Sequence, residues 1–592
     1  MKPLENTVGF LRRIFTNPPF LIYLAAFAAL LGQLEIFRTL VRQVNAWMNV
    51  DTLTVAGDVA VLLLPLVFLR PRWRRTVWFL IAGMTVFCYV NLWYCRAFYD
   101  LMPADSLGMG GNMQSRVVEA FFDQLRMADW LLLLPVAAFA AIWLPLRRKA
   151  LAVRFPISAK ITLTAVALLL YGGAYMARAY RLYDVNRKLG NYPHMLCNYF
   201  SYSKVKAYKF SQHLTRMGYI GYMGWQLDHA LLDHKLDKNE RSRIDAFWEC
   251  RRCRPSAAAD FRANRSRNLI FIIVESLASD AVGATVNGVE VAPTLSALAA
   301  DSSAIVFRRM QAQVNHGRSS DGQFIYNTGL LPLRNNVVAK RYPSANYPSI
   351  AKALGYANSS EVVGEKPTFY NHSITNLSYG YTGFVPATDA WLTDRRILDN
   401  ATAEIRRLKQ PFYCEITTLD MHDPYNHPIK EPTAISAAEG YDPRDLNYYE
   451  QVHVFDSLLA GFLSRLKADG LYDNSVIVIA SDHEPRKSAL SENGPISNDI
   501  FLLILNSGLP GGMHSDRIVG QVDVMPTILD VMGIDGYPYP GLGHSLVAEP
   551  RHQGATDAFG NVYGNTDDSA RNALEEAWQM SALMIEGAYF KK

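Results

Sequence analysis

Four side chains in the second half of the chain could together bind a divalent cation. Glu275, His422, Asp482 and His483 each stand at, or just beyond, the end of an apolar run. A mixed set of carboxylate oxygens and imidazole nitrogens favours zinc or manganese over calcium. A metal beside a hydroxyl lowers the pKa of that hydroxyl and makes it a nucleophile near neutral pH. The pattern therefore predicts a metal-dependent site for nucleophilic chemistry.

Ser319 is the hydroxyl whose surroundings suit that chemistry. It lies in a polar, glycine-flanked segment that reads Asn-His-Gly-Arg-Ser-Ser-Asp-Gly and precedes an apolar stretch able to begin a helix. Backbone amides at such a helix N-terminus would hold a phosphate. The segment alone is also typical of a helix cap. Arg318, within it, is either a cation that neutralises phosphate or an ordinary solvated arginine.

Apolar runs of strand length must bring these side chains together. The runs cover residues 268–275, 411–419, 475–483 and 501–505, and helical stretches such as 292–300 and 449–469 lie between them. Continuous apolar strands that alternate with helices predict a mainly parallel sheet with helices on both faces. Ligands bind beyond the carboxyl ends of the strands in such sheets. The candidate metal ligands are therefore expected at one edge of an α/β domain.

The N-terminal part of the chain has the apolar runs of a membrane domain. A run of about 20 residues with few charges spans a bilayer, and about 17 is still sufficient. Five such runs cover residues 18–34, 53–69, 76–95, 130–146 and 161–177, the second being the weakest because Asp58 interrupts it. Basic residues gather before the first run, between the second and third, and between the fourth and fifth. Since basic loops stay in the cytoplasm, the chain after residue 177 is expected outside the cell membrane.

These patterns divide the 592 residues into four parts. The predicted parts are a transmembrane domain of five helices (1–180), a juxtamembrane helical linker (181–263), a catalytic domain (264–550) and a C-terminal tail (551–592). A net charge of +5, from 59 basic and 54 acidic residues, is too small to indicate nucleic-acid binding. Cys250 and Cys253 have no second cysteine pair at zinc-site spacing, so a local disulfide or two free thiols are expected.

Several segments resemble the lipoteichoic acid synthase family, which belongs to the phosphoglycerol transferases of the alkaline phosphatase and sulfatase superfamily. The similar segments are residues 274–276, 317–324, 471–483 and 520–529. The resemblance implies an alkaline phosphatase/sulfatase-type outer domain in which Glu275, Ser319, Asp482 and His483 hold one divalent cation. It favours manganese, with zinc or magnesium as alternatives. Ser319 stands where the family has a threonine nucleophile, so the hydroxyl is kept.

The predicted substrate contacts depart from the family pattern. His422 matches a substrate-contacting histidine, and segment 365–372 resembles the stretch that binds the lipid headgroup. In that stretch Glu365 replaces an aspartate, Tyr370 a tryptophan and His372 an arginine. Losing an arginine removes a permanent, bidentate phosphate donor. The identity of the transferred headgroup and of its acceptor is therefore open.

The resemblance implies a membrane-bound enzyme that moves glycerol phosphate from phosphatidylglycerol, or a related phospholipid, to an acceptor hydroxyl. A covalent Ser319 intermediate would form and diacylglycerol would leave. The acceptor would be a glycolipid, a glycan or polyglycerol phosphate. The reaction would take place at the outer face of a bacterial cytoplasmic membrane that the chain crosses several times.

Three other functions compete with this prediction. A phosphoethanolamine transferase would use the same nucleophile. Such enzymes, however, usually carry disulfides in the outer domain and a nucleophile motif with a different sequence. A sulfatase would need a C/S-x-P-S-R type of motif, which the segment around Ser319 lacks. A catalytically silent sensor or scaffold would not need the complete set of four ligands.

Overall fold

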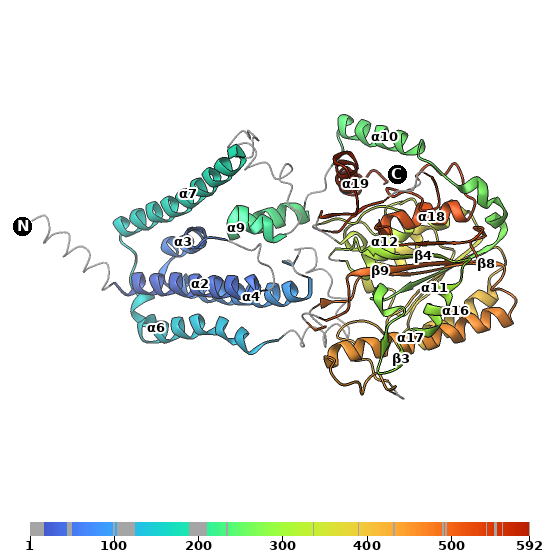
Figure 1. Cartoon of the computed structure of the whole chain (residues 1–592). Coiled ribbons are helices and arrows are strands. Elements are labelled where there is room, and N and C mark those ends of the chain that lie inside the picture. Colours follow the sequence, from blue (N-terminus) through green and yellow to red (C-terminus); the bar gives the residue numbers. More distant parts are fainter. Residues whose placement is uncertain are drawn as a thin grey trace, which may run out of the picture. The chain divides into compact units, whose positions relative to one another are not determined.

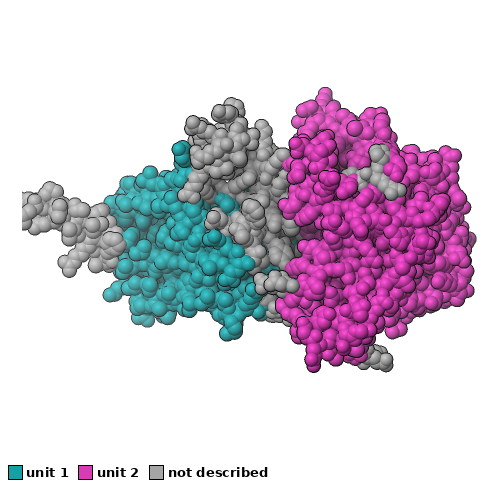
Figure 2. All heavy atoms as spheres, viewed as in Figure 1, with its two compact units in different colours: residues 1–104, 121–232 teal, residues 105–120, 233–592 magenta. Residues whose placement is uncertain are grey.

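The chain forms two compact units in the computed structural model. The structure describes residues 17–43, 50–98, 101–102, 125–188, 210–231 and 235–590, except for 316, 335–336, 389, 430–431, 488–489, 492–493, 540, 550–552 and 559. The first unit comprises residues 1–104 and 121–232, and the second comprises 105–120 and 233–592 (Figure 2). Cys197 and residues 189–209 of the predicted linker lie outside the described residues.

The first unit is helical. Its helices are α2 (Pro18–Arg42), α3 (Thr52–Phe68), α4 (Val77–Phe98), α6 (Leu134–Ala150), α7 (Ile157–Lys188) and α9 (Phe210–Leu231), with 3-10 turns before α4 and α6 (Figure 1). Four described stretches are long and apolar enough to cross a membrane: Pro18–Arg42, Pro71–Arg96, Met127–Ala150 and Ile157–Ala177. Helix α3, the predicted second span, has 17 residues and a length of about 25 Å, short of a hydrocarbon core of about 30 Å. Four of the five predicted spans thus qualify, and the fifth stays a prediction.

The structure gives the carboxylate of Asp58, in the apolar helix α3, a hydrogen-bonding role. The side chain is buried, and its Oδ2 accepts a hydrogen bond from the Tyr219 amide at 2.7 Å. Helix α9 breaks just before that amide, at Gly218, whose φ is 71°. Asp58 therefore satisfies a backbone donor at the start of the second half of α9. Tyr222 and Trp225 of that half are buried in the helical core, so the aromatic side chains of this segment pack against helices.

The second unit is built on a nine-stranded sheet with the order β10-β4-β9-β8-β1-β7-β5-β6, in which β11 also pairs with β4. The strands are β1 (Asn268–Val274), β4 (Ile305–Gln311), β5 (Asn358–Val363), β6 (Gly383–Val385), β7 (Phe412–Thr417), β8 (Ser475–Ser481), β9 (Asp499–Leu505), β10 (Met513–Ser515) and β11 (Val519–Gly520). All four predicted strands are present, as β1, β7, β8 and β9. Only β9 runs antiparallel to its neighbours, β4 and β8. The predicted mainly parallel sheet is confirmed.

Helices cover both faces of this sheet, as the apolar strands require. Alternate residues of β1 enter two different cores: Leu269, Phe271 and Ile273 enter one, and Ile270 and Ile272 enter the other. The first core lies under α12 (Ser319–Thr328), α14 (Ile350–Leu354), α18 (Val524–Val531) and α19 (Asp568–Glu586). The second lies under α11 (Pro293–Ala300), α16 (Asp394–Arg407) and α17 (Pro443–Ala468), on the opposite face (Figure 1).

The ends of the second unit share its first core. Trp248 of α10 (Lys238–Arg252) and Trp578 of α19 are both buried there. Trp578 Nε1 also donates to Thr556 Oγ1 at 2.6 Å, and the Leu331 amide donates to Ser581 Oγ at 3.0 Å. The packing therefore extends beyond residues 264–550 on both sides. The predicted division into domains stays a prediction.

Candidate active site

Strand pairing brings the predicted metal ligands together. Strands β1 and β8 are parallel neighbours with Val274 opposite Ser481, so Glu275 and the pair Asp482-His483 follow at the same level of the sheet edge. All three side chains are buried, and their ligand atoms lie within 4.8 Å of one another. His483 Nε2 lies 3.4 Å from Glu275 Oε1 and 3.4 Å from Asp482 Oδ2. Glu275, Asp482 and His483 are called the ligand cluster below.

Helix α12 positions Ser319 beside the ligand cluster. Ser319 is the first residue of that helix. Its Oγ donates to Glu275 Oε2 at 3.0 Å and lies 3.2 Å from His483 Nε2. A Cβ at Gly322 would stand 2.5 Å from the Asp482 carbonyl oxygen, so glycine is what lets α12 pack so closely against the end of β8. The serine predicted as nucleophile is therefore held against the predicted metal ligands.

The loop before α12 is fixed by the carboxylate of Asp321. Its Oδ2 accepts hydrogen bonds from the amides of Asn315 and Gly317, at 2.9 and 3.0 Å. Burial raises the pKa of Asp321 to about 7. Asp321 thus ties the loop back onto the first turn of the helix that carries Ser319.

Arg318 is largely buried and paired with a carboxylate, so it is not an ordinary solvated arginine, and its contact with phosphate stays a prediction. It takes a φ of 44°, and its Nη1 forms an ion pair with Glu484 Oε1 at 2.8 Å. Burial alone would lower the pKa of Arg318, but the charge of Glu484 and the hydrogen bond to it outweigh burial and raise it. Arg318 Nη2 also lies 3.1 Å from His483 Nδ1. In the structure Arg318 therefore contacts Glu484 and the Nδ1 side of the His483 ring.

Glu484 determines which nitrogen of His483 faces the site. His483 Nδ1 lies 2.9 Å from the Glu484 carbonyl oxygen, which can only accept a hydrogen bond. Arg318 Nη2, 3.1 Å from Nδ1, can only donate, but it already donates to the same Glu484 carbonyl oxygen at 2.8 Å. We therefore assign the proton to Nδ1, which leaves the lone pair of Nε2 pointing at the ligand cluster. Burial, followed by the charge of Arg318, lowers the pKa of His483 well below its ordinary value. A neutral imidazole held through its second nitrogen is the usual form of a metal-binding histidine.

The two carboxylates of the ligand cluster fit a divalent cation. Burial raises the pKa of Glu275 to about 8, and the nearby charge of Asp482 adds to the rise. Burial likewise raises the pKa of Asp482 to about 6. Asp482 Oδ2 is buried and has no hydrogen-bond partner among the described residues. The nearby cation, Arg318, is paired with Glu484. A metal ion would supply the further positive charge that two buried carboxylates beside a neutral imidazole require.

His422 and Tyr370, predicted to contact substrate, also lie near the ligand cluster. The charge of His422 acts on the pKa of Glu275. The ring of His422 stands 5.6 Å from that of Trp391, and its Nδ1 lies 2.7 Å from the Asp423 carbonyl oxygen. Burial raises the pKa of Tyr370, and the charges of Asp321 and Glu275 contribute to the rise. Tyr370 has a φ of 44°, an uncommon backbone conformation that occurs often at functional sites.

Glu365 and His372 lie in a different buried group of carboxylates. His372 Nδ1 is 3.4 Å from Glu361 Oε1. Burial alone would lower the pKa of His372, but the hydrogen bond with Glu361 and the charge of Glu365 raise it. Burial raises the pKa of Glu365 as well. Within the described part of the chain, no hydrogen bond or ion pair joins Glu365 or His372 to Ser319 or to the ligand cluster.

Three residues that support the site were missed in the sequence. Ser276 donates from its hydroxyl to Glu275 Oε1 at 2.9 Å and from its amide to Asp482 Oδ1 at 2.8 Å. Glu484 orients His483 and Arg318, and Arg486 forms an ion pair with Asp423 at 3.2 Å. All three are close in sequence to predicted ligands, but nothing in a linear pattern distinguishes such supporting residues.

Cys250 and Cys253 are exposed free thiols.

Comparison with known proteins agrees with this architecture. Residues 267–534 match the family model described as Sulfatase. The matched residues include the strands β1 to β9 that bear the candidate site, so this part of the chain is similar to that family. Lipoteichoic acid synthase of Staphylococcus aureus is 26% identical over 524 residues, which cover 82% of this chain and 77% of that protein. The resemblance seen in the sequence motifs is thereby confirmed.

Solved structures match the domain over most of their own length. The lipoteichoic acid synthase LtaP from Listeria monocytogenes has a TM-score of 0.44 and 20% identity, covering 55% of this chain and 93% of that chain. The Streptococcus pyogenes phosphoglycerol transferase GacH, solved with sn-glycerol-1-phosphate, has a TM-score of 0.41 and 14% identity, covering 61% of this chain and 99% of that chain.

A Gly322→Ala substitution should weaken metal binding. The added Cβ cannot be accommodated beside the Asp482 carbonyl oxygen, so α12 must move and the end of β8 with it. We expect a loss of Mn²⁺ affinity of roughly 10- to 100-fold, the usual effect of disturbing groups that orient metal ligands. Gly461→Ala, in helix α17, is the control because its Cβ would meet only the end of Arg465. Equal Mn²⁺ affinities of the two variants in calorimetry would contradict this packing.

Metal affinity should rise with pH. In the metal-free protein Asp482 and Glu275 hold protons up to pH values of about 6 and 8, and a metal must displace those protons. Mn²⁺ binding should therefore tighten steadily from acidic pH to about pH 8 and release protons, which titration in two buffers of different ionisation enthalpy measures. An affinity that stays constant across this range, in a protein that remains folded, would show that these carboxylates are not the ligands.

Proposed function

We propose that this chain is a membrane-bound phosphoglycerol transferase with Ser319 as its nucleophile. The observation that carries the proposal is the position of Ser319 Oγ, 3.0 Å from Glu275 and 3.2 Å from His483 at the first turn of α12. A match to the sulfatase family and a lipoteichoic acid synthase relative support phosphoglycerol transfer as the class of reaction.

Glu275, Asp482, His483 and the Ser319 hydroxyl would hold the cation, for which we propose manganese, with zinc or magnesium as alternatives. When bound, the metal supplies positive charge that favours the ionised hydroxyl and the negative charge of the phosphoryl group in the transition state. Ser276 and Glu484 keep the ligands in place, since they bond to Glu275, Asp482 and His483 directly.

In the first step Ser319 Oγ attacks the phosphorus of phosphatidylglycerol. The bond between Oγ and phosphorus forms, and the bond between phosphorus and the diacylglycerol oxygen breaks. The proton that leaves Ser319 ends on that oxygen, so diacylglycerol departs as a neutral alcohol and glycerol phosphate remains on the serine. The positive end of the α12 dipole favours the negative charge of the phosphate.

In the second step an acceptor hydroxyl attacks the phosphoserine. The bond between its oxygen and phosphorus forms, the bond to Ser319 breaks, and the acceptor proton returns to the serine. We assign the proton transfers to His422, whose side chain is 20% exposed and whose charge reaches Glu275. His372 is a weaker candidate because it is held against Glu361 within a buried group.

The glycerol end of the donor is assigned to Glu365, Tyr370 and His372. Tyr370 lies close enough for Glu275 and Asp321 to act on its pKa. Burial alone would lower the pKa of His372, but Glu361 and Glu365 raise it, which favours the protonated form at the place where the family has an arginine. Because these carboxylates share its charge, His372 would attract an anionic group less strongly than a free guanidinium and would offer fewer donors.

A lipid donor is consistent with a membrane anchor. Four apolar helices support anchoring, and we propose that α3 makes a fifth crossing with the support of its partner α9. With five crossings, the basic loops support an outer location of the sulfatase-like domain at a bacterial cytoplasmic membrane. Acceptors of the proposed class, a glycolipid, a glycan or polyglycerol phosphate, would be reached from that side.

Ser319→Ala should abolish diacylglycerol release. The purified full chain is incubated with labelled phosphatidylglycerol or phosphatidylethanolamine, with and without Mn²⁺. Release from phosphatidylglycerol should fall at least about a thousandfold, because the nucleophile is removed. Ser320→Ala is the matched control: its hydroxyl is also buried but has no partner among the described residues, so it should keep most activity.

The same assay separates the competing functions. Release from phosphatidylethanolamine alone would make the chain a phosphoethanolamine transferase. Release from neither lipid by the Mn²⁺-loaded wild-type protein would overturn the proposal of a lipid-dependent transferase.

A further inference from the structure

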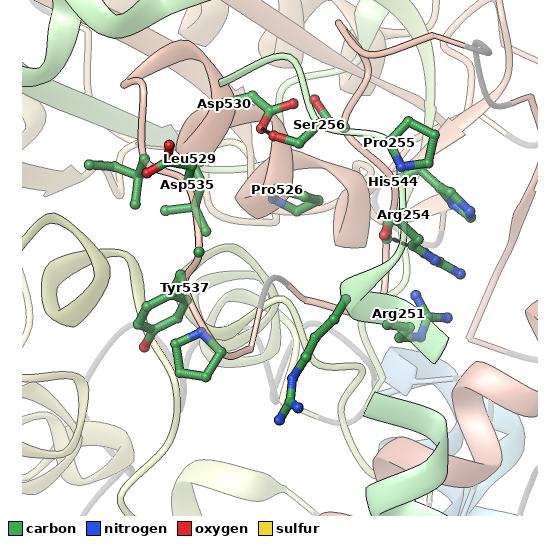
Figure 3. A pocket seen from close by; sticks show the side chains of 16 residues that line it. Arg251, Arg254, Pro255, Ser256, Pro526, Leu529, Asp530, Asp535, Tyr537 and His544 are labelled. Carbon is green, nitrogen blue, oxygen red and sulfur yellow. Dashed lines mark hydrogen bonds between the residues drawn. The ribbon is translucent and has the colours of Figure 1, made fainter. Parts of the chain in front are cut away.

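A cavity of about 330 Å³ lies in the second unit between the end of α10, helix α18 and the segment 534–545. Its lining includes Arg251, Arg252, Arg254, Asp530, Tyr537 and His544. Arg251, Arg254 and His544 gather on one side of the cavity, with Tyr537 on the other (Figure 3). The cavity is therefore basic on one wall and aromatic on the opposite wall.

This cavity is separate from the candidate active site. Gly329, which ends α12, accepts a hydrogen bond from the Leu542 amide at 2.7 Å, beside the cavity. Ser319 is at the other end of the same ten-residue helix, about 15 Å away at the usual rise per residue. Neither Ser319 nor any member of the ligand cluster lines the cavity.

Two of the arginines have backbone carbonyls as their only hydrogen-bond acceptors. Arg251, only 5% exposed, donates from Nη1 to the Leu542 carbonyl oxygen, and its Nε is buried without a partner. Arg254 Nη1 donates to the carbonyl oxygens of Leu542 and Gly543, at 3.0 and 2.6 Å. Among the described residues, no carboxylate forms an ion pair with either guanidinium. Carbonyl dipoles do not cancel a full charge, and the charge of Asp523 acts on both guanidinium groups without a direct ion pair, so both charges are only partly compensated.

The acidic residues nearby are already engaged elsewhere. Asp530 accepts hydrogen bonds from the Ser256 hydroxyl at 2.5 Å and the Ala257 amide at 2.7 Å. Asp535 forms an ion pair with Arg265 at 2.7 Å. Asp523 accepts from the amides of Gly520 and His544, which fixes its orientation, but its charge still acts on Arg251 and Arg254.

Burial confirms that the guanidinium charges are poorly compensated. It lowers the pKa of Arg254 to about 10, and it lowers that of Arg251 well below its ordinary value. Arg252 differs from both, because it is exposed and pairs with Glu249 at 2.6 Å.

We propose that this cavity binds a phosphate-bearing anion whose counter-charges are Arg251 and Arg254. Guanidinium groups match phosphate oxygens in bidentate geometry, and two of them offer more donors than a carboxylate can accept. The aromatic and aliphatic wall of Leu529 and Tyr537 faces the carbon part of a phosphate ester. A second hollow of about 150 Å³ is lined by both arginines, by His544 and by Asp523, and small glycine and alanine residues also contribute to its lining. This inference does not depend on the proposed function.

Two sources could supply this chemistry: a soluble phosphate ester, or the headgroup of an anionic phospholipid. The full chain in phosphatidylcholine nanodiscs is titrated with inorganic phosphate and with glycerol phosphate, in EDTA to disable the ligand cluster. Parallel samples use phosphatidylglycerol nanodiscs without soluble ester. Hydrogen exchange of peptides from 250–258 and 534–545 reports occupancy. Slower exchange with soluble ester identifies the first source, and slower exchange in phosphatidylglycerol alone identifies the second.

Arg254→Gln should weaken the affinity that produces this protection at least about tenfold, because a charge-assisted contact is lost. Arg262→Gln is the matched control, since Arg262 is an exposed arginine of the neighbouring segment that does not line the cavity. Ser319→Ala should keep the full affinity, which separates this cavity from the active site. Absence of protection in the wild-type protein under all conditions, or unchanged affinity in Arg254→Gln, would overturn the proposal.

Discussion

The pairing of β1 with β8 is the constraint on which the site depends. It places two carboxylates, Glu275 and Asp482, side by side at a buried sheet edge, where like charges repel strongly in a low dielectric. A bound cation would offset this repulsion, and His483 adds a neutral nitrogen ligand at the same point. The close approach of α12, which Gly322 makes possible, then brings a hydroxyl into the same small space.

Two other buried carboxylates, Glu361 and Glu415, have side-chain donors on both of their oxygens, and this difference from Asp482 is consistent with a metal at the ligand cluster. Glu415 accepts hydrogen bonds from Gln323, Asn327 and Tyr413 at 2.8 to 2.9 Å. Its neighbour Glu361 accepts from Gln323 and Asn376. Neutral donors thus surround these two carboxylates. Asp482 Oδ2 has no such donor among the described residues, although it is as deeply buried.

The sequence revealed the strands that are apolar throughout and the polar residues that follow them. β1 and β8 are buried on both faces, so each is apolar along most of its length with its functional residue just beyond. β7 is also buried on both faces, although Glu415 interrupts its apolar run. β5 has no such run, because Glu361 within it belongs to an internal polar group. The direction of β9 and the pairing of Arg318 with Glu484 depend on contacts far apart in sequence. The basic cavity was hidden for the same reason, since Arg254 and Leu542 meet only in the fold.

Mass spectrometry of the peptide that contains Ser319 tests the central claim most directly. The full chain is mixed with phosphatidylglycerol and Mn²⁺ without added acceptor, stopped with acid and digested. We predict a phosphoglycerol group on Ser319 that disappears when an acceptor alcohol is added before the acid, and that never forms in Ser319→Ala. Diacylglycerol release with the adduct on a different residue, or with no adduct on any peptide, would contradict the account.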